Sequence, residues 1–148
     1  MCIRDRINDT GFPGMKILQF AFDPESDSDY LPHNHERNSV AYTGTHDNKT
    51  VRDWIDTAPV KAKKFAIKYL KLDDKDEGYN WGLIRGVWSS GAYLSIAQMQ
   101  DFLDLGEESR MNIPATLGSN WTWRVKKSDL NQKLYKRIAD LTRTYRRG

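Results

Sequence analysis

The sequence predicts an α/β fold with parallel strands, because short apolar runs alternate with longer segments of helical periodicity. The apolar runs cover residues 15–22, 40–42 and 92–97. Helical segments separate the second run from the third, as the crossover between parallel strands requires. A few strands with open edges bury too little apolar surface to be stable alone. We therefore expect the chain to be the end of a larger sheet.

The first predicted strand follows a segment rich in turn formers, Asn8 to Gly14. Met15 to Phe22 is then almost continuously apolar, which is typical of a parallel strand buried on both faces. Asp23 to Asn38 is polar throughout and predicts a long loop over the end of the sheet. The next strand is predicted at Val40 to Tyr42.

Several helices and a third strand are predicted after residue 48. In order, they are a helix from Asn48 through Trp54, a helix opened by Pro59, a charged connector at Leu72 to Gly78, a helix over Tyr79 to Ser89, a strand over Ala92 to Ala97 and a short turn or helix at Phe102 to Leu105. Apolar side chains recur at helical spacing along one side of these helices, as with Phe65 and Tyr69 or Trp81 and Ile84.

The last part of the chain contains an irregular stretch and a helix. Glu107 to Trp123 has neither helical nor strand periodicity in its apolar residues. It carries Pro, Gly and Asn beside two Trp, so we predict an ordered functional loop. Ser128 is a plausible N-cap for an amphipathic helix that runs to the end. Its apolar side is formed by Leu130, Leu134, Ile138, Leu141 and Tyr145.

The composition limits the possible partners and compartments. The net charge of +3 gives little support for a nucleic-acid partner. Basic residues concentrate at 61–71 and 124–147, so an anion-binding module stays open beside the simpler interpretation of solvated helix faces. No apolar run approaches the roughly 20 residues of a membrane span, so we expect no membrane partner. The single cysteine, Cys2, forms no internal disulfide, which favours a reducing, cytoplasmic location.

The first residues differ in character from those that follow. Met1 to Arg6 has no apolar core and joins abruptly to the next segment, so it is interpreted as a non-native leader rather than a signal peptide. Residues 7–148 are expected to form the folded portion.

A candidate site follows the second predicted strand. The run Val40 to Asn48 passes from apolar residues into His46 and Asp47, where a strand would give way to a loop. Strand ends on a rigid sheet are where α/β enzymes place their chemistry. His46 and Asp47 place an imidazole beside a carboxylate, and Gly44 allows close approach to the backbone. The pattern indicates part of an active site.

Four ordered motifs resemble those of one enzyme family, the 4-α-glucanotransferases, also called amylomaltases or disproportionating enzymes, of glycoside hydrolase family 77. They are Gly11-Phe-Pro-Gly-Met-Lys16 with Leu18-Gln-Phe20, Tyr30-Leu-Pro-His-Asn34, Tyr42-Thr-Gly-Thr-His-Asp-Asn48, and Arg110-Met-Asn-Ile-Pro-Ala-Thr116 with Asn120-Trp-Thr-Trp-Arg124. The resemblance runs from about Gly11 to the end. It implies a (β/α)8 barrel of which residues 7–148 would be the C-terminal portion, with about the last three strands and their helices.

The resemblance also implies an activity and roles for particular residues. The reaction is transfer of an α-1,4-glucan segment between maltooligosaccharides, or to glucose, with retention at the anomeric carbon and without a cofactor. In the family, the residue matching Asp47 stabilises the transition state, and the residue matching His46 contacts the same sugar. The other expected substrate-binding residues are Asn48, Asn112, Pro114, Asn120 and Trp121.

The sequence departs from the family pattern in ways that matter. The family's nucleophilic Asp lies in an Arg-x-Asp strand end and its acid/base Glu in Glu-Asp-Leu-Gly; neither motif is recognised here, so the chain alone is expected to be inactive. A non-catalytic remnant that binds α-glucan is the alternative. Ala115 stands where the family has Gly, and His35 where it has an aromatic residue. A metal cluster of His33, His35, His46 and Asp47 matches no metal motif in its spacing, so no metal is expected.

Overall fold

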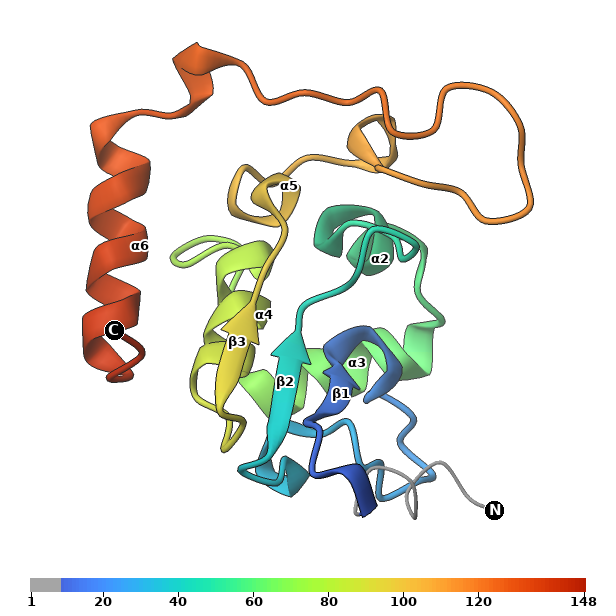
Figure 1. Ribbon diagram of the computed structural model, residues 1–148, viewed down its shortest axis with the longest axis vertical. Helices are drawn as coiled ribbons and strands as arrows, with labels where there is room; N and C mark the ends of the chain where they lie inside the picture. The colour runs from blue at the N-terminus through green and yellow to red at the C-terminus, as the bar shows by residue number, and fades with distance from the viewer. Residues whose placement is uncertain (1–8) are drawn as a thin grey trace.

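The computed structural model describes residues 9–148 and contains a parallel sheet with helices packed behind it (Figure 1). Its strands are β1 (Gly14–Ile17), β2 (Ser39–Tyr42) and β3 (Leu94–Ile96). They lie in the order β1-β2-β3 and both pairings are parallel, which confirms the predicted α/β class. The proposed leader, Met1 to Arg6, lies outside the described residues.

The helices follow the predicted order. They are α2 (Val51–Thr57), α3 (Val60–Leu70), α4 (Tyr79–Trp88), α5 (Met99–Phe102) and α6 (Gln132–Thr144), with short 3₁₀ helices at Leu18–Phe20, Pro32–Asn34, Glu107–Ser109 and Lys127–Asp129. In Figure 1, α3 and α4 lie behind the sheet, α2 lies beyond the carboxyl end of β2, and α6 stands at one side. No helix of the described part is long and apolar enough to cross a membrane.

The core lies between the sheet and α4, which is buried almost throughout its length. Ile84 and Val87 are fully buried, and the glycines of α4 allow α3 to approach. A Cβ added at Gly86 would lie 2.8 Å from Leu70 Cδ2, at the end of α3. Helix α4 therefore packs closely against the end of α3.

Two predicted strands are shorter than their apolar runs. The backbone turns into a 3₁₀ helix at Leu18, so β1 ends at Ile17 and not at Phe22. The expectation of burial on both faces is also wrong for the first strand, since Met15 of β1 is 55% exposed. Within the described residues, β1 pairs with β2 alone, so Met15 lies on a strand with a neighbour on one side only.

Two predicted helix starts are displaced by local hydrogen bonds. Helix α2 begins at Val51, where Thr50 Oγ1 accepts from the amide of Asp53. Asn131, and not Ser128, is the N-cap of α6, and its Oδ1 accepts from the amide of Leu134. Ser128 instead lies in a preceding 3₁₀ helix.

Candidate active site

The loop that carries His46 and Asp47, called the candidate loop below, begins directly after β2, as the sequence predicts. Asn48 Oδ1 accepts from the amide and the hydroxyl of Thr45 at 2.9 and 2.7 Å, which folds the loop into a tight turn. This turn leaves the side chains of His46 and Asp47 about half exposed, at 53% and 49%. Asn48 therefore shapes the loop from within.

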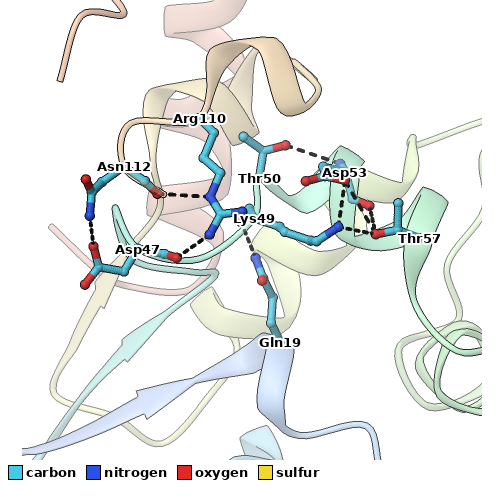
Figure 2. A network of polar contacts seen from close by, with 8 residues as sticks. All are labelled: Gln19, Asp47, Lys49, Thr50, Asp53, Thr57, Arg110 and Asn112. Atoms are coloured by element: carbon cyan, nitrogen blue, oxygen red, sulfur yellow. Dashed lines mark hydrogen bonds and ion pairs between the residues drawn. The ribbon is translucent and has the colours of Figure 1, made fainter. Parts of the chain in front are cut away.

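A second segment, distant in sequence, binds this loop at its tip (Figure 2). Asn112 Nδ2 donates to Asp47 Oδ1 at 2.6 Å, and the amide of Asn112 donates to the carbonyl of His46 at 3.1 Å. Arg110 donates to the backbone carbonyls of Asp47 and Asn112 at 2.6 and 3.0 Å. The structure thus brings the predicted residues Asp47 and Asn112 into direct contact, and Arg110 joins the two loops.

The carboxylate of Asp47 is only partly used by these contacts. Its Oδ1 accepts from Asn112, and His46 Nε2 lies 3.4 Å from the same oxygen. Its Oδ2 accepts no hydrogen bond from the described residues. One oxygen therefore fixes the orientation of the group, and the other is available to a ligand.

Trp121 covers the imidazole of His46. The centroids of the two rings lie 4.9 Å apart at an interplanar angle of 44°. Trp121 has a φ of 65°, which is uncommon for a bulky residue, and its amide donates to the carbonyl of Met111 at 2.7 Å. Its side chain is still 52% exposed, so an indole surface remains free beside His46.

The remaining predicted residues of the second loop differ in role. Asn120 Oδ1 accepts from the amide of Ile113 at 3.0 Å, and its Nδ2 donates to Thr116, so Asn120 closes the loop on itself. Pro114 is exposed on the outside of the same loop. The structure brings neither residue into contact with Asp47.

Ala115 adopts a φ of 61°, which is the left-handed region that favours glycine. We expect Ala115→Gly to stabilise the chain by about 0.5–1 kcal/mol, because it removes a left-handed alanine at some cost in chain entropy. Thermal unfolding measures the change. Ala139→Gly, on an exposed face of α6, is the matched control and should destabilise by about 1 kcal/mol. Loss of stability in both variants would contradict the strain at Ala115.

The base of the candidate loop is held from the side of β1. Gln19, just after β1, donates from Nε2 to the carbonyl of Lys49 at 2.7 Å. A Cβ at Gly44 would lie 2.5 Å from Gln19 Nε2, so the close approach at Gly44 is made by Gln19. Lys49 Nζ in turn contacts Asp53 Oδ1 at 3.1 Å and Thr57 Oγ1 at 2.8 Å (Figure 2).

A pocket of about 390 Å³ opens beside Gln19 and is lined in part by Phe20 and Trp54. Phe20 is 53% exposed, which is unusual for phenylalanine. The exposed ring was not singled out from the sequence, because Leu18-Gln-Phe20 reads there as the continuation of a strand. A larger hollow of about 540 Å³ lies at the amino end of β3 and contains neither His46 nor Asp47.

The other histidines are engaged elsewhere. His33 Nδ1 lies 2.7 Å from the hydroxyl of Tyr69, and His35 Nε2 lies 2.9 Å from the carbonyl of Tyr30. Burial lowers the pKa of His35 below the usual value. Among residues 9–148, no three potential metal ligands gather at one point.

Arg110 is a functional candidate that the sequence did not indicate, and Asp101 was a possible site residue only because it follows the last predicted strand. Asp101 follows β3 and is 1% exposed, and burial raises its pKa to about 6. Its position after a strand was the only signal in the sequence. Arg110 belonged to the Arg110-Met-Asn motif but was given no role, because nothing in the neighbouring sequence indicates that it contacts Asp47.

Comparison with known proteins gives a consistent result. A family model described as 4-alpha-glucanotransferase matches residues 1–131. A 4-alpha-glucanotransferase of Clostridium butyricum is 58% identical over 93% of the chain, and a chloroplastic/amyloplastic one of Solanum tuberosum is 49% identical over 91%. The chain spans 28% and 24% of these two proteins, respectively.

Solved structures agree with the sequence comparison. The structure of an amylomaltase from Streptococcus agalactiae in complex with acarbose matches the whole chain with a TM-score of 0.93 and 36% identity. The chain covers 30% of that protein. An amylomaltase from Corynebacterium glutamicum matches 95% of the chain with a TM-score of 0.67 at 16% identity, which shows a likeness of fold alone.

Proposed function

Because the chain belongs to the 4-alpha-glucanotransferase family, with the fold of part of a (β/α)8 barrel, we propose that its His46–Asp47 loop forms one wall of a glucan-transferring active site. The reaction is the retaining transfer of an α-1,4-glucan segment from one maltooligosaccharide to another, or to glucose. The observation that carries the proposal is that only one oxygen of the Asp47 carboxylate accepts a hydrogen bond from the described residues. Asn112 fixes its Oδ1, and its Oδ2 is free to accept from a sugar hydroxyl.

Asp47 acts on the transition state in this proposal. Glycosyl transfer passes through an oxocarbenium-like state that carries positive charge on the sugar ring. A carboxylate held in a fixed orientation stabilises that charge without reorganising during the reaction. His46, 3.4 Å from the same carboxylate, binds a neighbouring hydroxyl of the donor sugar.

Aromatic side chains supply the apolar contacts that sugar rings favour. The exposed indole of Trp121 lies against His46, and the exposed ring of Phe20 lines the pocket beside Gln19. We assign Trp121 to the sugar next to Asp47. Asn112 and Asn48 act by orienting Asp47 and its loop, and Asn120 and Pro114 act by shaping the loop that carries Trp121.

Complete catalysis requires two further carboxylates about 5–5.5 Å apart, one as nucleophile and one as acid/base. We propose that these come from the part of the family's length that this chain does not span.

The cellular compartment of the protein is also a matter of proposal. The single cysteine suits a reducing one such as the cytoplasm, while the plant relatives carry the description chloroplastic/amyloplastic.

A chimera tests the proposal. This chain replaces the matching 28% of the Clostridium butyricum relative, and glucose release from maltotriose is measured. We expect activity within about tenfold of the unmodified relative, because 58% identity preserves most contacts. The chain alone should release no glucose. A chimera that unfolds cooperatively, like the relative, but has no activity would overturn the proposal.

A further inference from the structure

Asp101 occupies a fixed position between the sheet and two helices. It lies in α5, just after β3, and its amide donates to the carbonyl of Gln98 at 3.0 Å. Its own carbonyl accepts from Asn80 Nδ2 of α4 at 2.9 Å. The backbone of Asp101 is therefore held from both directions, and its carboxylate is aimed at the neighbouring β2–α2 connection.

The two oxygens of this carboxylate contact the two ends of the candidate loop. Oδ2 accepts from Thr43 Oγ1 at 2.6 Å, and Oδ1 accepts from the amide of Val51 at 2.8 Å. Thr43 is the residue directly after β2, and Val51 is the first residue of α2. All the residues that carry the proposed chemistry on this loop lie between these two contacts.

We infer that Asp101 is a positioning residue, which sets the place of His46 and Asp47 by holding their loop at both ends. The inference rests on the proposed function of Asp47. It assigns to the segment after β3 a part in the site that does not involve touching a sugar, since Asp101 is only 1% exposed.

A carboxylate suits this position because it accepts from both groups at once, although only the contact with Val51 requires an acceptor. The amide of Val51 can only donate, whereas the hydroxyl of Thr43 can donate or accept. An asparagine at position 101 therefore keeps the contact with Val51 and reverses the one with Thr43. An alanine loses both and leaves the amide of Val51 buried without a partner.

Burying the carboxylate of Asp101 is energetically unfavourable, which indicates that its hydrogen bonds are important for the position of the loop. Burial raises its pKa to about 6, while the bonds from Thr43 and Val51 act in the opposite direction. Asp104 is the one charged group that contributes to this shift, and it forms an ion pair with Arg52. A leucine would avoid the desolvation, so a buried carboxylate is not explained by packing alone.

Hydrogen exchange in the chimera tests the positioning role directly. We expect Asp101→Ala and Thr43→Val to speed exchange about tenfold in the peptide spanning residues 44–50, with α6 unchanged. Asp101→Asn should give a smaller effect, and Thr43→Ser should restore protection. Asp140→Asn, on the exposed face of α6, is the control and should leave residues 44–50 unchanged. Uniform acceleration over the whole chain in Thr43→Val and Asp101→Asn would reduce Asp101 to a general stabilising residue.

Kinetics in the chimera separate this inference from the proposed function. A positioning residue lowers kcat, so Asp101→Asn should reduce kcat about tenfold with KM within about threefold, and Thr43→Ser should match the parent. An active chimera in which Asp101→Asn and Thr43→Val change neither kcat nor exchange overturns the positioning role. An inactive, folded chimera with selective loop exchange overturns the proposed function and leaves the positioning role in place.

Discussion

Replacing Asp47 with alanine in the chimera is expected to lower kcat about a thousandfold, which corresponds to roughly 4 kcal/mol of lost transition-state stabilisation. The reason is that Asp47 offers a fixed, partly free carboxylate where positive charge develops on the sugar. The KM for maltotriose should change by less than about fivefold, because binding in the ground state draws on Trp121 and other contacts as well. Glucose release under saturating and limiting maltotriose measures both constants.

Two further variants separate charge from position. Asp47→Asn keeps an oxygen that can accept from Asn112 and removes the charge, so it should be nearly as inactive as Asp47→Ala. Asp140→Asn is the control, since Asp140 lies on the exposed face of α6 and pairs with Arg143. An Asp47→Asn chimera with more than about a tenth of the parental kcat would contradict the electrostatic role.

Ile84→Ala is expected to give the largest loss of stability, about 3–4 kcal/mol in the free energy of unfolding. Ile84 is fully buried in α4, where the sheet and the neighbouring helices leave little room to close a cavity. Since a folded protein has about 5–15 kcal/mol in total, this loss is a large fraction of the stability, and the thermal midpoint of the chimera should fall by several degrees.

The measurement is urea and thermal unfolding of the chimera, followed by circular dichroism. Val60→Ala is the matched control, because Val60 is 68% exposed at the start of α3 and should change stability by less than about 0.5 kcal/mol. Ile84→Val should fall between them, at about 1 kcal/mol. Equal effects of Ile84→Ala and Val60→Ala would show that α4 is not the centre of the core.

Local patterns in the sequence predicted most of the fold. The alternation of apolar runs and helical periods is a local property, and it predicted the order of the elements and the parallel strands. The exact end of β1 was wrong because Gln19 turns inward to bond Lys49, a contact between distant residues that no periodicity reveals. The start of α6 was wrong because Ser128 and Asn131 are both good N-caps, and it is the side chain of Asn131 that accepts from an amide of the helix.

The candidate site was predictable only where its residues form a motif. His46 and Asp47 stand together at a strand end, so the sequence shows them directly. Arg110 and Asp101 contact the same loop from positions far along the chain, Arg110 at the carbonyl of Asp47 and Asp101 at the hydroxyl of Thr43. Such contacts depend on which βα connections lie next to each other in space, and this information becomes available only with the sheet order.

The pairing of β2 with β3 also has a consequence for synthesis. Ala41 pairs with Ser95 about fifty residues later, and a ribosome adds roughly 5–20 residues per second. Until β3 emerges, β2 has no hydrogen-bonding partner on the edge that β3 will occupy. The nascent chain therefore spends several seconds with an unsatisfied strand edge, and this interval is when a holding chaperone would have most to protect.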